Sequence, residues 1–226
     1  MVNVATRVML GRTLRELGYP PGLLPPRPYY GVKAPVFSFA KLTEVDVDLG
    51  PEMKSTGEIM GVNPDYPQAL YKALVAAGVD VPQRGKLLVT IADRDKPEAA
   101  DLIREFARLG FRIYATRGTS DFLRARGIEN TPVKKISEGS PNLTDLIRGE
   151  EVDLLINTIS KSKRPEREGW RIRRASVEHN LPCLTSLDTA RALLVALSGR
   201  REGETFAVHT IDDYSRQGNP EPAPGS

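Results

Sequence analysis

The chain has 226 residues, of which 40% are hydrophobic, so it is long enough to bury the core of one ordinary domain with an appendage. Its 32 basic and 29 acidic residues leave a net charge of +3, a balance that does not indicate a nucleic-acid-binding protein. Its apolar runs fall far short of the roughly 20 residues of a membrane-spanning helix, and no charged-then-apolar leader opens the chain. We therefore expect no nucleic acid or membrane among its partners, and no export.

The cysteine and histidine content argues against disulfides and metal chemistry. The single cysteine, Cys183, cannot form an internal disulfide, and its apolar neighbours favour a small buried residue over a nucleophile. His179 and His209 lie in unrelated contexts, so the sequence contains no zinc-type cluster of ligands. We expect a cytoplasmic protein that holds no metal.

The first part of the chain is irregular. Apolar residues at helical spacing predict a helix over residues 4–17, and the prolines of residues 20–28 predict an extended connection. Residues 36–39 and 45–47 have the composition of short strands but too few partners for a stable sheet. We therefore expect this part to be stabilised by packing against structure outside it.

From about residue 66 onward, strands and helices alternate in the pattern of a parallel sheet covered by helices. Residues 152–157 are mostly apolar, as expected for a central strand buried on both faces. The expected strands are residues 86–92, 112–115, 132–134, 152–157 and 182–184. The expected helices are residues 69–77, 97–109, 120–126, 143–148, 171–179 and 188–197. A last strand at 205–208 and a disordered tail at 219–226 complete the prediction.

The turn Thr-Arg-Gly-Thr at residues 116–119, between a predicted strand and a predicted helix, is typical of a phosphate site. Backbone amides in the first turn of a helix lack intrahelical partners and carry the positive end of the helix dipole. Gly118 would let a ligand approach, and Thr116 and Thr119 would add hydroxyl donors. The same turn also arises from simple helix capping by Thr119 or Ser120.

Polar residues follow the other predicted strands as well. Because ligands of open parallel sheets bind outside the carboxyl ends of the strands, we expect these residues to meet at one edge. Each has an ordinary interpretation by itself, as a surface charge or a hydroxyl bonded to its own backbone. Together, lysines, hydroxyls and an amide predict a mononucleotide or sugar-phosphate site. They are Asp93-Arg94-Asp95-Lys96, Lys135, Asn157-Thr158 and Thr185-Ser186.

Residues 50–61, Gly-Pro-Glu-Met-Lys-Ser-Thr-Gly-Glu-Ile-Met-Gly, resemble the segment that closes the second ATP-grasp unit in the large subunit of carbamoyl phosphate synthetase. Further motifs occur in the order of that subunit's C-terminal regulatory domain. They are Asp-Lys at 95–96, Ala-Thr-Arg-Gly-Thr at 115–119, Lys-Ile-Ser-Glu-Gly at 135–139, Ile-Asn-Thr at 156–158 and Ile-Arg-Arg at 172–174. The resemblance extends from about residue 4 to about residue 196.

The resemblance implies an α/β, methylglyoxal-synthase-like (Rossmann/flavodoxin-like) five-stranded parallel sheet flanked by helices. It assigns residues 1–65 to an irregular remnant of an ATP-grasp domain, 66–212 to an allosteric domain and 213–226 to a disordered tail. The family makes carbamoyl phosphate with ATP and magnesium, for pyrimidine and arginine biosynthesis. This chain lacks the nucleotide lid and the magnesium-binding carboxylates of that ligase, so we expect it to be non-catalytic and to need no cofactor.

In this family the regulatory domain binds UMP as an inhibitor, and often IMP as an activator, in one phosphate pocket. Ile159 stands where the family commonly has a hydroxyl, which removes a donor and puts effector affinity or identity in doubt. The expected effector residues are Lys96, Thr116, Gly118, Thr119, Lys135, Asn157 and Thr158.

Ornithine, another effector of the family, binds between this domain and the catalytic body. The resemblance places Thr90 and Thr185 on that side. Family members have an acidic residue after a Val-Lys pair, whereas Ala34 follows that pair here, so we expect a weak or absent ornithine response unless another acid substitutes. The expected partners are a UMP/IMP-type nucleotide, the rest of the large subunit, the glutaminase small subunit and oligomer contacts.

Two other functions stay open. Methylglyoxal synthase needs a carboxylate base and a histidine near a triose phosphate. Here Glu-Gly-Ser-Pro-Asn at 138–142 replaces the Gly-Gly-Asp segment of that family, and residues 161–167 contain no histidine. A structural or oligomerisation module is the other alternative. We rank regulation first, structural docking second and independent catalysis last.

Overall fold

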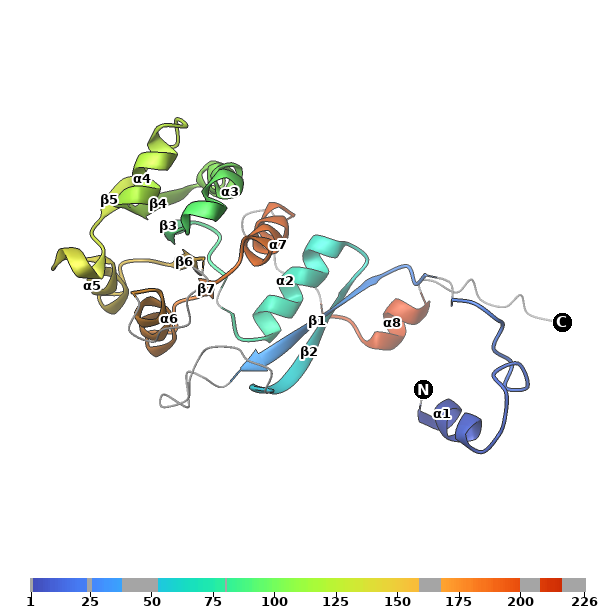
Figure 1. The fold of residues 1–226 in the computed structure, drawn as a ribbon. Coiled ribbons are helices and arrows are strands. Elements are labelled where there is room, and N and C mark those ends of the chain that lie inside the picture. The colour runs from blue at the N-terminus through green and yellow to red at the C-terminus, as the bar shows by residue number, and fades with distance from the viewer. Residues whose placement is uncertain are drawn as a thin grey trace. The chain divides into compact units, whose positions relative to one another are not determined.

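The computed structural model describes residues 2–23, 26–37, 53–79, 81–158, 168–199 and 208–216. The chain divides into two compact units, Tyr29–His209 and the pair of segments Met1–Pro28 and Thr210–Ser226. The first unit holds a two-stranded and a five-stranded sheet (Figure 1). The second holds the helices α1 (Val2–Met9) and α8 (Ile211–Arg216).

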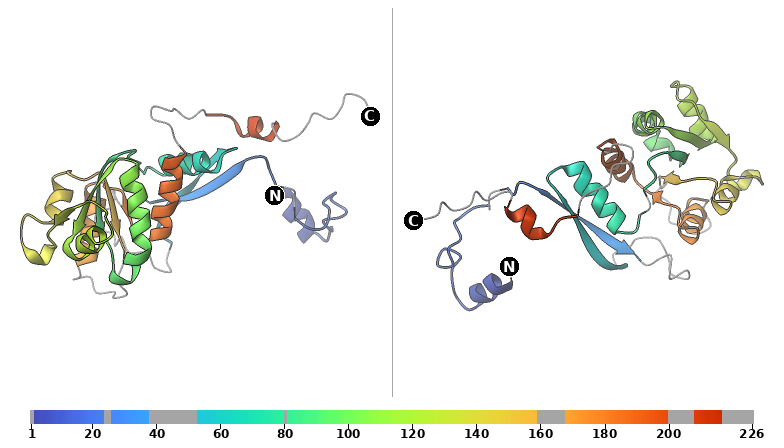
Figure 2. Two further views of the ribbon diagram at one scale, coloured as in Figure 1. Left: turned by 90° about the horizontal axis from the view of Figure 1, so that it is seen from above. Right: turned by 180° about the vertical axis from the view of Figure 1, so that it is seen from behind.

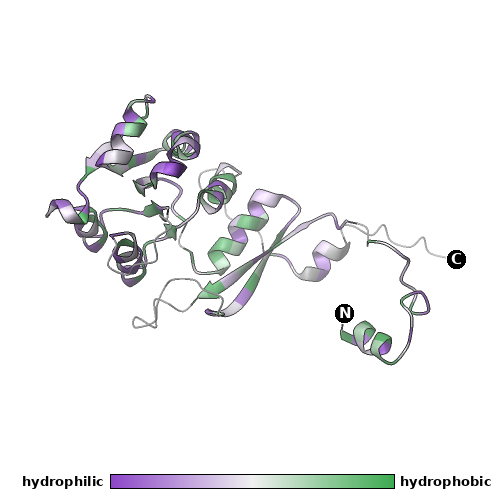
Figure 3. Cartoon of the chain, in the orientation of Figure 1, coloured by the Kyte–Doolittle hydropathy of each residue, from purple (hydrophilic) through white to green (hydrophobic). Residues whose placement is uncertain are grey.

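Helix α1 is much shorter than the helix predicted over residues 4–17. It ends because Gly11 takes a left-handed conformation, with φ at +91°, and Arg12 donates its backbone N–H back to the carbonyl of Arg7 at 3.0 Å. This is a glycine-based helix stop, which the apolar spacing concealed. None of the described residues between 2 and 23 is buried, although part of α1 is hydrophobic in composition (Figure 3).

The two-stranded sheet is an antiparallel pair of β1 (Tyr30–Phe37) and β2 (Ser55–Asn63), packed on helix α2 (Tyr66–Ala76). The strand predicted at 36–39 therefore begins at Tyr30. Strand β2 was missed because three exposed residues near its start, Thr-Gly-Glu at 56–58, do not show the alternation that marks a strand. The strand predicted at 45–47 lies outside the described residues.

The five-stranded sheet is parallel throughout, in the order β5-β4-β3-β6-β7, with helices on both faces (Figure 2). The predicted α/β class with a five-stranded parallel sheet is confirmed. The strands are β3 (Gly85–Thr90), β4 (Phe111–Thr116), β5 (Thr131–Val133), β6 (Leu154–Asn157) and β7 (Cys183–Leu184). The helices are α3 (Lys96–Arg108), α4 (Arg117–Arg124), α5 (Leu143–Arg148), α6 (Glu168–Glu178) and α7 (Leu187–Ser198). Two 3₁₀ turns, η1 (Asp93–Asp95) and η2 (Ile136–Glu138), precede α3 and α5.

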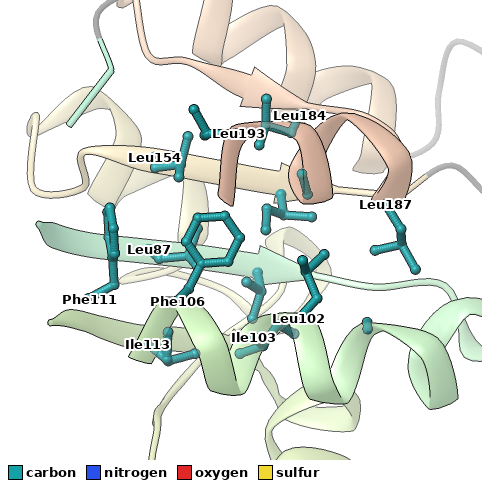
Figure 4. Packing of buried hydrophobic residues seen from close by; sticks show 14 of the residues in the cluster. Leu87, Leu102, Ile103, Phe106, Phe111, Ile113, Leu154, Leu184, Leu187 and Leu193 are labelled. Atoms are coloured by element: carbon teal, nitrogen blue, oxygen red, sulfur yellow. The ribbon is translucent and has the colours of Figure 1, made fainter. Parts of the chain in front are cut away.

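Two apolar layers cover the faces of this sheet, because side chains alternate along each strand. Leu87 of β3 faces the layer formed with α2, α3, α4 and α7, where Phe106 of α3 is fully buried (Figure 4). Leu88, the next residue, faces the layer formed with α5 and α6, which contribute Ile147 and Ile172. The fold therefore holds the carboxyl ends of the strands between two packed layers.

The predicted elements of the five-stranded sheet and its helices agree with the observed ones to within three residues at each end. Helix α4 begins at Arg117 rather than at Ser120, and Thr116 is its N-cap residue without a capping hydrogen bond from its side chain. Capping of this helix by Thr119 or Ser120 is therefore wrong. Val208 is not in a strand, and the rest of the strand predicted at 205–208 and the predicted tail lie outside the described residues.

Candidate functional site

The carboxyl edge of the five-stranded sheet contains a point where the strand order reverses. From the central strand β3, the chain proceeds to β4 and β5 on one side, then crosses to β6 and β7 on the other side. The edge between β3 and β6 is thus the topological switch point, where open α/β sheets bind their ligands. The candidate residues lie along the carboxyl edge of the sheet on both sides of this point.

A row of polar residues crosses the sheet at the switch point. Register pairs Thr90 of β3 with Asn157 of β6, and extends to Thr116 at the end of β4 and to Thr185 after β7. Thr90 is two residues after Leu88, so the row lies on the face covered by α5 and α6. Two of the predicted effector residues, Thr116 and Asn157, therefore share one row with the predicted ornithine-side residues Thr90 and Thr185.

Lys96, the first residue of α3, is directed at the first turn of α4. Its Nζ donates to the carbonyl oxygen of Gly118 at 2.7 Å and forms an ion pair with Asp93 Oδ1 at 2.6 Å. A Cβ at Gly118 would lie 3.4 Å from this Nζ, at the near limit of ordinary van der Waals contact. The predicted association of Lys96 with the Thr-Arg-Gly-Thr turn is thus a direct contact.

The hydroxyls of Thr116 and Thr119 are buried and hydrogen bonded within the protein. Thr119 Oγ1 accepts the backbone N–H of Ile91 at 3.2 Å, and Thr116 Oγ1 donates to Thr119 Oγ1 at 3.5 Å. They fix the end of β3 against the start of α4. Donors for an anion at this turn are therefore better sought in the first backbone amides of α4, which have no intrahelical acceptor.

The second lysine, Lys135, is exposed and caps the turn η2, where its backbone N–H donates to Glu138 Oε2 at 2.8 Å. Its charge reaches Asp93. The pKa of Asp93 is lowered from the usual aspartate value, first by the hydrogen bond from Lys96, then by the charge of Lys96, and in addition by the charge of Lys135. Both lysines of the predicted site thus act on one carboxylate.

Asn157 and Thr158 hold the switch point together. Thr158 Oγ1 accepts the backbone N–H of Ala92 at 2.8 Å, and its own N–H donates to the Thr90 carbonyl at 3.1 Å. Asn157 is buried, and its Nδ2 donates to the carbonyl of Gly169 at the start of α6 at 3.1 Å. The loops after β3 and β6 are therefore tied together by the side chains that the sequence nominated as ligand contacts.

Of the two positions predicted to weaken effector responses, the structure describes only Ala34. Ile159 lies outside the described residues. Ala34 lies in β1 beside Lys33, whose Nζ is 2.6 Å from Glu58 Oε2 on β2, so the nearby acid is already ion paired. Thr185 is exposed.

Cys183 lies in β7 and is partly buried. Burial raises the pKa of its thiol to about 11, against smaller opposing effects of a hydrogen bond with Ser176 and the charge of Arg173. The thiol is therefore uncharged at neutral pH, as a structural cysteine should be. Within the described ranges, no group of three or more His, Cys, Asp or Glu could hold a metal ion, and no helix is long and apolar enough to cross a membrane.

Sequence reasoning missed two acidic residues that shape this edge. Asp93 was placed after β3 but not included in the site, although its spacing of three residues from Lys96 favours an ion pair. Glu168, the first residue of α6, accepts the backbone N–H of Ser137 at 2.6 Å and so links α6 to the turn that carries Lys135. That contact joins distant segments and has no sequence signal.

Comparison with known families gives a match that spans four of the five strands of this sheet. Residues 98–185 match the MGS-like domain. The matched span runs from α3 to the residue after β7 and includes the Thr-Arg-Gly-Thr turn. Among solved structures, methylglyoxal synthase from Elizabethkingia anophelis NUHP1 aligns with a TM-score of 0.42 at 19% identity, over 63% of this chain and 97% of that one.

Proposed function

We propose that the MGS-like domain binds a nucleoside monophosphate of the UMP/IMP class at the carboxyl edge of its sheet, as the regulatory part of a carbamoyl phosphate synthetase large subunit. The contact of Lys96 Nζ with Gly118, at 2.7 Å from its carbonyl oxygen, carries this proposal. It brings a cation to the first turn of α4, on the β4 side of the switch point, where backbone amides already favour an anion.

The described residues would bind the two parts of the ligand by different contacts. The amides at the start of α4, with Lys96 and Lys135, would bind the phosphate through hydrogen bonds and charge. Asn157 donates its Nδ2 to Gly169, so its Oδ1 would accept a hydrogen bond from the base or the sugar. Such a site recognises a phosphorylated molecule without altering it.

A regulatory site fits this edge better than the elimination that methylglyoxal synthase performs. That reaction needs a histidine near the triose phosphate, and the chain has two histidines in all. His179 follows α6, whose start lies at the carboxyl edge, so this histidine is at the opposite edge of the sheet. His209 is exposed beyond α7. The regulatory effect would arise from a nucleotide that prefers one arrangement of the full enzyme.

Calorimetric titration tests the site. UMP and IMP are titrated into the wild-type protein, with uridine as the ligand that lacks the phosphate. We expect a dissociation constant below about 1 mM for at least one nucleotide and no measurable heat of binding for uridine. Lys96→Ala should weaken nucleotide binding at least about tenfold, because it removes a charge-assisted contact to phosphate.

Two control variants separate the site from general effects. Thr119→Ser keeps the hydroxyl that accepts the Ile91 N–H and should bind as the wild type does. Lys33→Ala removes an equal charge from the two-stranded sheet of β1 and β2, where Lys33 is ion paired with Glu58, and should also leave binding unchanged. Failure of both nucleotides to bind, or equal binding by Lys96→Ala, contradicts the proposal. Release of methylglyoxal from dihydroxyacetone phosphate would instead favour the enzymatic alternative.

A further inference from the structure

Asp93 and Lys96 differ sharply in their surroundings. The side chain of Lys96 is 13% exposed and held between two acceptors, whereas the side chain of Asp93 is 95% exposed. The cation is thus fixed by the fold, while its carboxylate partner lies in solvent at the first residue of a single 3₁₀ turn. Rotation of Asp93 away from Lys96 would expose little new surface and break no packing.

The charges around Asp93 are those that would receive a phosphate. Lys96 is hydrogen bonded to it, Lys135 acts on it through its charge, and the adjacent Arg94 is paired with Asp95 at 3.1 Å instead. The Asp93 carboxylate therefore already neutralises the positive charge proposed to hold the ligand. A second anion on the same ammonium group would be repelled by this carboxylate.

We propose that Asp93 competes with the phosphate of the ligand for Lys96, and that its displacement sets the affinity of the site. This inference rests on the proposed function, since it assumes that a phosphate binds at Lys96. Asp93 is then an affinity-determining residue that touches the cation and not the ligand. Binding would exchange one partner of Lys96 for another, which keeps a largely buried ammonium group neutralised in both states.

The test compares Asp93→Asn with Asp101→Asn in calorimetric titrations of UMP and of inorganic phosphate. Asp101 lies on α3, is 87% exposed and pairs with Arg104, so its replacement removes the same charge without touching Lys96. We expect Asp93→Asn to bind both ligands about three- to tenfold more tightly than the wild type, with Asp101→Asn less than about twofold changed. Higher salt should reduce the difference.

Carbon-13 NMR of the Asp93 carboxyl group supplies a readout independent of affinity. Without phosphate its pKa should lie below the usual aspartate value, and saturating phosphate should raise it, because Asp93 then leaves Lys96. Equal affinity of Asp93→Asn and wild type, with binding still abolished by Lys96→Ala, overturns the competition but leaves the proposed function standing. No binding of either ligand to any variant overturns both.

Discussion

At the scale of single residues, two fully buried serines differ in whether their hydroxyls are hydrogen bonded. Ser176 Oγ in α6 donates to the carbonyl of Arg173 at 2.7 Å, whereas Ser120 Oγ in α4 has no partner among the described residues. A buried polar group without a partner destabilises a protein by about 1–3 kcal/mol relative to one that is satisfied. Ser120 is therefore a local weakness directly behind the Thr-Arg-Gly-Thr turn.

Replacing Ser120 by alanine should stabilise the protein by about 1 kcal/mol, because the unsatisfied hydroxyl is removed. Ser176→Ala is the matched control, since it makes the same change in a helix and shares the gain in helix propensity. We expect Ser176→Ala to be less stable than Ser120→Ala by about 1 kcal/mol or more. Urea unfolding followed by circular dichroism measures both, and the opposite ranking would contradict this account.

At the scale of elements, the two-stranded sheet of β1 and β2 packs on α2 through a close approach of the β2 and α2 backbones. A methyl group on Gly61 of β2 would overlap the carbonyl oxygen of Ala69 in α2, so only a hydrogen fits there. Gly57, in the same strand, has open space where a Cβ would lie. Packing against α2 thus explains why the last residue of the motif at 50–61 is a glycine.

Gly61→Ala should lower the free energy of unfolding by about 2 kcal/mol or more, since the strand must move away from α2 to admit the methyl group. Gly57→Ala should change it by less than about 0.5 kcal/mol. Thermal unfolding of the two variants beside the wild type gives the comparison. Similar melting temperatures for both would show that β2 and α2 separate without cost.

At the scale of the whole molecule, the two units differ in how much they bury. The unit Tyr29–His209 contains both apolar layers of the parallel sheet. The described residues from 2 to 23 contain none that is buried, and α1 presents its apolar side chains to solvent. The stability of the parallel sheet should therefore depend little on the first helix.

A variant that lacks residues 1–23 should melt within about 2 °C of the full chain, because no buried contact is lost. Differential scanning calorimetry measures this, and UMP titration of the same variant should give an unchanged dissociation constant. A fall in melting temperature of more than about 4 °C would mean that α1 contributes to the stability of the sheet.

The sequence by itself determined the alternation of strands and helices, because apolar periodicity reports local geometry directly. It also nominated Lys96 and the Thr-Arg-Gly-Thr turn, since the ends of parallel strands meet at one edge. It missed β2. It also missed the early end of α1, where Gly11 overrides the apolar spacing of a helix. Its assignment of a regulatory nucleotide site stays a prediction.

Only the tertiary structure decided which polar side chains are hydrogen bonded within the fold and which could contact a ligand. Register aligned Thr90 and Asn157 in one row, and packing engaged the hydroxyls of Thr119 and Thr158 in the fold. It also directed Lys96 to the carbonyl oxygen of Gly118, 22 residues away in the sequence. Such pairings depend on distances between segments remote in sequence, or on the orientation of a side chain within a turn, and periodicity carries neither.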